Sequence, residues 1–284
     1  MRYNWNWGIL WETSADGHNT WIMTLFHGLG WTLAAAACAW VIAILLGSVV
    51  GVMRTTPSKW AQRVGNAWVE LFRNIPLLVQ LFLWYFVLPE VLPKGMGDSL
   101  KQMAPPWGSF VPAVIGLGLF TSARVAEQVR AGIQALPRGQ GMAGTALGLP
   151  LPQTYRYVLL PMAYRIILPP LTSETMNLIK NTSVALTIGL IELTAAGRSM
   201  QEYTFQVFEA FTAATVIYIA VAAVLQKGLY EGLIAKVMSW FSLLKRYEDF
   251  NLGILGLSPV VYYLSFSAAF VFLTARMIDR KRWM

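Results

Sequence analysis

Charged residues are scarce in this chain. They make up 13% of its 284 residues, whereas hydrophobic residues make up 56%. Soluble domains usually carry about 25% charged residues, so this composition excludes an ordinary soluble fold. Several apolar runs reach the roughly 20 residues that a helix needs to cross a bilayer. They lack the alternation of apolar and polar residues that barrel strands would show. The sequence therefore predicts an all-α integral membrane protein.

Histidine and cysteine are also rare. The two histidines, His18 and His27, lie near the start of the chain, and the single cysteine, Cys38, lies in an apolar run. One cysteine cannot form an internal disulfide, and the histidines have no partners at metal-ligand spacing. We therefore predict no metal site.

Enzyme motifs are missing as well. The sequence has no GxSxG nucleophile motif and no GxxxxGK phosphate-binding loop followed by Ser or Thr. Gly139, Gly141 and Gly144 match the GxGxxG dinucleotide pattern, but no strand precedes them, so we interpret the match as chance. We expect no catalytic residue, no bound cofactor and no ATPase site in the chain itself.

The chain nevertheless has a net charge of +8. Its Lys and Arg residues lie mostly in short loops between apolar runs, as is usual for cytoplasmic loops of membrane proteins. We therefore interpret the charge as a topology signal and expect no nucleic acid partner. Arg54, Lys59 and Arg63 follow the first apolar run, which places that end in the cytoplasm and the N-terminus outside. Residues 1–20 are polar and rich in Trp, and they do not resemble a cleaved signal peptide.

Five spans are expected in the first 225 residues. They lie within residues 20–53, 66–87, 110–130, 164–196 and 205–225. We expect the fourth span to be broken at Pro169–Pro170 and residues 89–107 to form an outside loop.

A sixth apolar run, residues 254–275, precedes a cluster of basic residues. If the fifth span ends inside, that cluster would lie outside, against the positive-inside bias. We therefore separate residues 1–235, a transmembrane domain, from residues 236–284, an atypical tail.

Charged residues inside the predicted spans are candidates for a transport pathway, because an ionised side chain at mid-bilayer costs at least about 2.5–3.5 kcal/mol. Arg124, Glu127 and Arg130 are spaced by three residues on one helix face. They form either an ion network near the cytoplasmic surface or a site where Arg124 meets an anionic substrate. Glu174 and Asn177 share a face of the fourth span in the same way. The predicted substrate pathway is Arg124, Glu127, Glu174 and Asn177.

The stretch 138–161 lies between apolar segments, outside the bilayer on the cytoplasmic side. It is dense in small residues, among them Ala143, Gly144 and Gly148. Small side chains let another surface approach closely, and Gly148 with Pro150 is typical of a helix end. This pattern favours a docking element over an inert loop.

This stretch resembles the EAA motif of permease subunits of ABC importers. The matching residues are Met142-Ala143-Gly144, Gly148 and Leu160-Pro161, although Met142 replaces the family's Glu and Gly144 replaces its second Ala. The resemblance implies an ATPase-coupling surface, and the residues it assigns are Gly139, Met142, Ala143, Gly144, Gly148, Leu160 and Pro161.

Further segments are similar to the permeases of polar amino acid importers. They are residues 70–80, 123–132, 180–183 and 191–193. Arg124 and the start of stretch 138–161 look most like glutamate/aspartate importer permeases. The tail resembles instead the C-terminal end of an ABC-2 type exporter subunit, which indicates a fusion, a frame change or a designed join.

The resemblance implies the type I ABC importer transmembrane fold, with five core helices and a possible extra C-terminal helix. It implies a permease for polar, acidic L-amino acids in a bacterial inner (plasma) membrane. The expected partners are ATPase subunits that bind ATP and Mg, a second permease subunit and a periplasmic or extracellular substrate-binding protein. Three alternatives stay open: an ion-coupled secondary amino acid transporter, a membrane-embedded enzyme, for which the sequence shows no catalytic cluster, and a non-transporting assembly partner in a membrane complex.

Overall fold

The computed structural model describes residues 3–227, and within this range the chain is helical and contains no β-strand. The prediction of an all-α fold is confirmed for this part of the chain. Contacts divide the whole chain into two units, Met1–Val224 and Leu225–Met284. The predicted tail, residues 236–284 with its apolar segment 254–275, lies outside the described residues.

Three helices are long and apolar enough to cross a membrane, namely Trp21–Met53, Trp107–Gln134 and Val207–Leu225. Two pairs of helices pass the same test only together, because each pair is bent at a short break. If each bent pair forms one span, the described residues contain five spans, as the sequence predicts.

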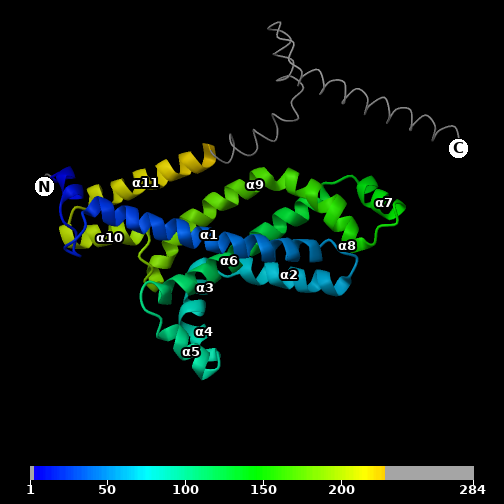
Figure 1. Cartoon of the computed structure of the whole chain (residues 1–284), viewed down its shortest axis with the longest axis horizontal. Coiled ribbons are helices and arrows are strands. Elements are labelled where there is room, and N and C mark those ends of the chain that lie inside the picture. The colour runs from blue at the N-terminus through cyan, green and yellow to red at the C-terminus, as the bar shows by residue number, and fades with distance from the viewer. Residues whose placement is uncertain (1–2, 228–284) are drawn as a thin grey trace, which may run out of the picture. The chain divides into compact units, whose positions relative to one another are not determined.

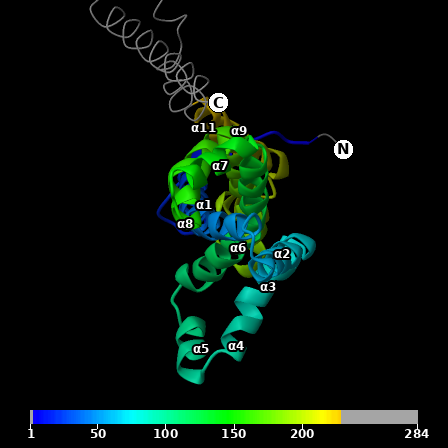
Figure 2. The same cartoon turned by 90° about the vertical axis from the view of Figure 1, so that its right-hand side faces the viewer.

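The first long helix, α1 (Trp21–Met53), contains no proline and is about 50 Å long at 1.5 Å per residue. It lies beside α6 (Trp107–Gln134) in both views (Figure 1, Figure 2). A Cβ atom on Gly47 would lie 2.6 Å from the Cβ of Val125, closer than real contacts permit. Glycine at this position therefore lets the two helices approach each other.

The second span is broken. Helix α2 (Lys59–Asn74) ends before Ile75, whose backbone is extended because a following proline disfavours the helical conformation. The chain then bends by 101° into α3 (Leu77–Phe82). The predicted second span, residues 66–87, is therefore bent at this break.

Gln80 holds this break together. Its side-chain amide donates hydrogen bonds to the carbonyl oxygens of Phe72 and Ile75, both at 2.9 Å. These carbonyls are at the end of α2, where a helix has no backbone donor for them. The one polar residue in the apolar run that follows Pro76 thus satisfies the interrupted backbone.

A short helical hairpin follows, in place of the loop expected at residues 89–107. It consists of the π-helical turn η2 (Leu83–Val87), α4 (Leu88–Val91) and α5 (Lys94–Lys101). The Lys101 ammonium lies 2.7 Å from a carboxylate oxygen of Glu90, which ties α5 to α4.

Helix α6 is the central element of the described bundle, because α1, α2, α3 and α9 all contact it. It contains the predicted span 110–130 and extends beyond it at both ends. Val125 and Val129 are fully buried between α1 and α9.

The stretch 138–161 folds into two short helices and a π-helical turn. These are α7 (Arg138–Ala146), α8 (Leu151–Thr154) and η3 (Tyr155–Leu159). The turn between α7 and α8 uses Gly148 with a φ of +72°, a backbone conformation that glycine adopts without strain. In Figure 1, α7 lies at the opposite end of α1 from the N-terminal segment.

The fourth span breaks at a different place from the one expected. Helix α9 (Leu160–Asn181) runs through Pro169 and Pro170, so the predicted break there is wrong. Ile167 and Leu171, on either side of the prolines, are buried in the core cluster that α9 shares with α6, and this packing holds the helix together. The break comes later, where η4 (Thr182–Ile188) ends at Gly189 with a φ of +84°.

Two more helices complete the described chain, α10 (Leu193–Thr204) and α11 (Val207–Lys227). The last part of the predicted fourth span, residues 183–196, is thus most of η4, a short extended link and the start of α10. Before α1, the Trp-rich segment forms a 3-10 helix, η1 (Trp7–Trp11), and buries Ile9 against Trp21 and Met200.

Candidate functional site

A polar cavity of about 410 Å³ lies among α2, α6 and α9. Three of the four residues predicted for the substrate pathway, Arg124, Glu127 and Glu174, line it together. The other lining residues are Arg73, Phe120 and Gln128. Ionised groups are costly inside a membrane protein unless they pair or face water or a ligand, so this cavity is the leading candidate for a substrate site.

Arg124 projects from α6 into the cavity with 43% of its side chain exposed. The central carbon of its guanidinium lies 5.1 Å from the centre of the Phe120 ring, within the range of a cation–π contact. Its nearest anion is Glu174, with 3.7 Å between Nη1 and Oε2, which is too long for a hydrogen bond. The aromatic ring therefore orients a guanidinium whose donors remain available to a ligand.

Glu174 comes from α9 and faces Arg124 across the cavity. Only 12% of its side chain is exposed, and its Oε2 atom is buried without a hydrogen-bond partner among the described residues. Buried polar atoms in native proteins nearly always have a partner. A cationic or N–H donor from a bound molecule would supply the missing one.

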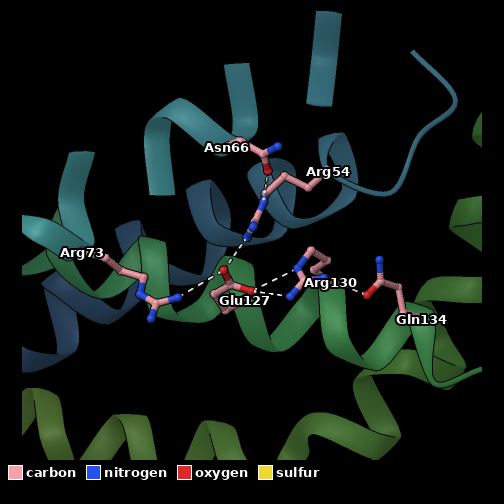
Figure 3. Close-up of polar contacts among 6 residues, drawn as sticks. All are labelled: Arg54, Asn66, Arg73, Glu127, Arg130 and Gln134. Carbon is pink, nitrogen blue, oxygen red and sulfur yellow. Dashed lines mark hydrogen bonds and ion pairs between the residues drawn. The ribbon is translucent and has the colours of Figure 1, made fainter. Parts of the chain in front are cut away.

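Glu127 occupies a different environment, which Figure 3 shows. Its Oε1 atom lies 3.0 Å from Nη1 of Arg54 and 3.3 Å from Nη1 of Arg73. Its Oε2 atom accepts from Nε of Arg130 at 3.0 Å and lies 3.0 Å from Nη2 of the same residue. The pairing of Glu127 with Arg130 is the neighbour relation expected from the spacing, whereas Arg124 turns away to Glu174.

The network joins three helices. Arg54 follows the last residue of α1 and donates from Nε to the Asn66 side chain on α2 at 2.7 Å. Arg130 continues along α6 to the Gln134 side-chain oxygen at 2.8 Å. Glu127 therefore fixes the end of α1 and the end of α2 against α6.

The charges do not balance. Four guanidinium groups, those of Arg54, Arg73, Arg124 and Arg130, pair with the two carboxylates of Glu127 and Glu174, so the cluster has a net charge of +2, although only Arg73 and Arg124 of these arginines line the cavity itself. A concave site with an excess of one sign raises the local concentration of ligands of the other sign. The cavity is therefore suited to an anionic molecule.

Asn177, the fourth predicted pathway residue, is half-buried one turn beyond Glu174 on α9 and does not line this cavity. Three lining residues of the cavity, Arg73, Phe120 and Gln128, were not among the predicted ones, and neither was Arg54 in the adjoining network. Arg54 was interpreted only as a topology marker after the first span. Arg73 lies in the segment 70–80 whose similarity to amino acid permeases was noted, and this was the signal that could have identified it.

The predicted coupling residues gather at the α7–α8 end of the unit. Gly139, Met142, Ala143 and Gly144 lie on α7, Gly148 forms the turn, and Leu160 and Pro161 begin α9. A Cβ atom on Gly144 would lie 2.6 Å from Cγ2 of Thr154, so this glycine serves the packing of α7 on α8. A Cβ atom on Gly139 would meet nothing within 4 Å, which leaves that face open.

Large apolar side chains are exposed beside these glycines. They are Met142, Leu147, Leu151 and Tyr157. Exposed apolar groups close together mark surfaces that contact another molecule. The predicted docking surface therefore has both open backbone and apolar side chains.

Among the described residues no group of three or more His, Cys, Asp or Glu side chains is placed to hold an ion. The carboxylates of the cavity face guanidinium groups instead.

A second polar cluster, which the sequence did not reveal, lies around Glu192. Its fully buried carboxylate accepts a hydrogen bond from the backbone N–H of Ala195 at 2.8 Å and caps α10. The hydroxyl of Tyr218 on α11 donates to it at 2.9 Å, and that of Thr32 on α1 donates at 3.4 Å. Glu192 thus joins α1, α10 and α11.

Comparison with known proteins agrees with this architecture. The family model for the inner membrane component of binding-protein-dependent transport systems matches residues 43–239. The glutamate/aspartate import permease protein GltJ of Escherichia coli strain K12 is 48% identical over 224 residues, covering 78% of this chain and 91% of that protein. The glutamine transport system permease protein GlnP of the same organism is 30% identical over 220 residues, covering 78% of this chain and 92% of that protein.

Solved structures show the same fold. One structure of an amino acid ABC transporter with histidines is 31% identical, with a TM-score of 0.62, and covers 74% of this chain and 92% of that chain. A methionine ABC transporter in an inward-facing conformation is 22% identical, with a TM-score of 0.62, and supports the fold alone.

The type I ABC importer fold predicted from the sequence is confirmed, and so is the prediction of an ABC importer permease over the alternative of an ion-coupled transporter. Permeases of this kind work with ATPase subunits and substrate-binding proteins. This chain belongs to the family of binding-protein-dependent transport system inner membrane components, as the integral membrane permease subunit of an amino acid ABC importer.

Proposed function

We propose that this permease carries acidic L-amino acids, glutamate or aspartate, into the cell. The observation that carries the proposal is the exposed guanidinium that Arg124 presents to the cavity, within a cluster of four arginines and two carboxylates whose net charge is +2. An acidic amino acid has a net charge of −1, whereas glutamine is neutral, so the excess positive charge favours the former. The name of the 48% identical relative, a glutamate/aspartate import permease, supports the same substrate class.

The proposed mechanism is alternating access driven by partner ATPases that bind ATP and Mg. The ATPases would contact α7 and the turn at Gly148, and their closure would push on this surface. Because α7 and α8 lead directly into η3 and α9, a push would be transmitted to the helix that carries Glu174. The cavity would then open to alternate sides of the membrane.

The proposed assembly contains a second permease subunit and an external substrate-binding protein in the inner membrane of a bacterium. The N-terminus would lie outside, because Arg54, Lys59 and Arg63 at the other end of α1 favour the cytoplasm. The Trp-rich segment before α1 would then lie at the outer interface, where such residues are enriched.

Substrate-stimulated ATP hydrolysis tests this function. The complex of permease, ATPase and binding protein would be reconstituted in nanodiscs and exposed to a panel of amino acids. We expect glutamate and aspartate to stimulate hydrolysis more strongly than glutamine, histidine or methionine. Stimulation by neutral or basic amino acids alone would contradict an acidic substrate.

Replacement of Arg124 tests the residue that carries the proposal. We expect Arg124→Ala to lower glutamate and aspartate uptake at least about tenfold, because a hydrogen bond to a charged group contributes about 1.5–3 kcal/mol. Arg198→Ala provides the control, since Arg198 pairs with Glu202 on α10, away from the cavity. Both variants should co-purify with the ATPase. Unchanged uptake by Arg124→Ala in vesicles would contradict the role given to Arg124.

A further inference from the structure

We propose that the cavity recognises an acidic amino acid at three points: Glu174 binds the ammonium, Arg124 binds the α-carboxylate, and Arg73 binds the side-chain carboxylate. This inference rests on the proposed function and adds to it the residue that separates acidic from neutral substrates. Arg73 belongs to the lining of the cavity, and within residues 3–227 its ion pair is with Glu127.

The ammonium position follows from Glu174. Its Oε2 atom is buried and lacks a hydrogen-bond partner among the described residues, although it lines the cavity. An amino acid ammonium brings three N–H donors and a positive charge, which match a carboxylate oxygen in this state. An anionic ligand group would leave the oxygen unsatisfied.

The α-carboxylate position follows from covalent geometry. In every amino acid the ammonium and the α-carboxylate are attached to the same carbon, so their receptors must be neighbours. Arg124 is the cation beside Glu174, with 3.7 Å between Nη1 and Oε2. Because this pair is too long for a hydrogen bond, a ligand can engage both groups without first breaking one.

The side-chain carboxylate requires a second cation on the cavity wall, and Arg73 supplies it. This residue is at the end of α2, and 55% of its side chain is exposed. Its contact with Glu127, at 3.3 Å, is the longest of the contacts that this carboxylate makes with guanidinium groups. Arg73 is therefore the guanidinium that Glu127 releases most readily.

Release of Arg73 does not leave a buried charge unpaired. Glu127 keeps Arg54 on one oxygen and both contacts to Arg130 on the other. The substrate carboxylate thus takes the place of Glu127 beside Arg73, and each carboxylate remains paired with guanidinium. Figure 3 shows Arg73 reaching Glu127 from the opposite side to Arg130.

This arrangement makes different predictions for the two arginines. Arg124→Gln removes the partner of a group that all amino acids possess, so it should weaken glutamate and glutamine alike. Arg73→Gln removes the partner of a group that only acidic amino acids possess. It should lower glutamate affinity at least about tenfold and leave glutamine affinity nearly unchanged, since a charge-assisted hydrogen bond is lost for one ligand only.

The experiment measures binding of labelled glutamate and glutamine to the purified permease and ATPase complex without binding protein, so that the selectivity belongs to the permease. Arg73→Lys should keep part of the preference, because the charge remains while the planar donor pair is lost. Arg198→Gln, on α10, should bind as the unmodified complex does. Co-purification with the ATPase shows that each variant is folded.

The outcomes separate the two levels of the proposal. If the unmodified complex shows no preference for glutamate or aspartate, the proposed function fails. If it does and Arg73→Gln keeps the same ratio of glutamate to glutamine affinity, Arg73 is not the selective residue. An equal loss for both amino acids in Arg73→Gln would also contradict the assignment, because it would place Arg73 on the common part of the substrate.

Discussion

At the scale of single residues, similar carboxylates have different tasks because their surroundings differ. Glu127 is held by three arginines, Glu174 has an oxygen that lacks a hydrogen-bond partner among the described residues, and Glu192 caps a helix and accepts from neutral donors. Spacing alone predicts that Glu127 and Arg130 are neighbours on one helix. It cannot predict that Arg54 and Glu174 arrive from α1 and α9, because these contacts depend on tertiary packing.

Glu192 is expected to stabilise the junction of α1, α10 and α11. Glu192→Gln replaces one accepting oxygen with an NH2 group that faces donors, so buried donors lose their acceptor. We predict that the free energy of unfolding falls by about 1–3 kcal/mol. Denaturant titration in detergent micelles would measure it. The control, Glu202→Gln, removes an exposed ion pair with Arg198 and should change the free energy of unfolding by less than about 1 kcal/mol. An equal effect of the two variants would contradict the role of Glu192.

Asp16 provides a prediction about pH outside the spans. The backbone and side-chain N–H groups of Asn19, the hydroxyl of Ser14 and the backbone N–H of His18 donate to its carboxylate and hold its pKa well below the ordinary value of 3.8. A lowered pKa means that the stabilisation is complete above about pH 4 and is lost as the pH falls further toward the folded-state pKa.

Hydrogen exchange at the amides of His18 and Asn19 tests this turn. We expect both amides to be protected above about pH 4, because the ionised carboxylate of Asp16 then accepts their hydrogen bonds. Asp16→Ala should remove the protection, and Asp16→Asn should keep part of it because one acceptor oxygen remains. Equal protection in all three proteins would show that the carboxylate does not close the turn.

At the scale of elements, prolines differ in whether they end a helix. Pro76 ends α2 because the residue before a proline avoids the helical region, and the backbone of Ile75 is extended. Pro169 and Pro170 also carry no N–H donor, yet α9 continues, because Ile167 and Leu171 are buried against α6. A local rule therefore predicts the outcome only where tertiary packing does not oppose it.

The α7–α8 turn provides a matched pair of glycines. Gly144→Ala would place a Cβ atom 2.6 Å from Thr154, whereas Gly141→Ala would place one in open space on the same helix. We expect Gly144→Ala to displace α7 and lower both ATPase co-purification and amino acid uptake severalfold. Gly141→Ala should leave α7 in place, because alanine is favoured over glycine in helices. Normal coupling in Gly144→Ala would show that the packing on Thr154 is not needed for docking.

Met142 tests the register of the coupling surface. It is exposed on α7 and stands where the family has a glutamate. Met142→Glu should strengthen association with the ATPase, because it restores the carboxylate that the family has at this position. The association would be measured by co-purification at rising salt concentration. Loss of association would indicate that the EAA positions are assigned in the wrong register.

At the scale of the whole molecule, the fold was accessible from the sequence and the cavity only in part. Long apolar runs and the positive-inside bias define the spans, and the family resemblance supplies their arrangement. The cavity depends on side chains from α2, α6 and α9 that are far apart in sequence. Arg124, Glu127 and Glu174 could be identified as unusual charges, but the excess of positive charge required Arg54 and Arg73 in place.

The central claim is that this chain imports acidic amino acids in an ATP-driven complex. It is tested most directly by accumulation of labelled glutamate in proteoliposomes that contain the complete complex. ATP is supplied on the side of the ATPases and loaded binding protein on the opposite side. We predict that glutamate and aspartate accumulate only with ATP, that a proton ionophore has little effect, and that unlabelled aspartate competes better than unlabelled glutamine. Glutamate uptake driven by a proton gradient in the absence of ATP, or no accumulation of either acidic amino acid, would contradict the account.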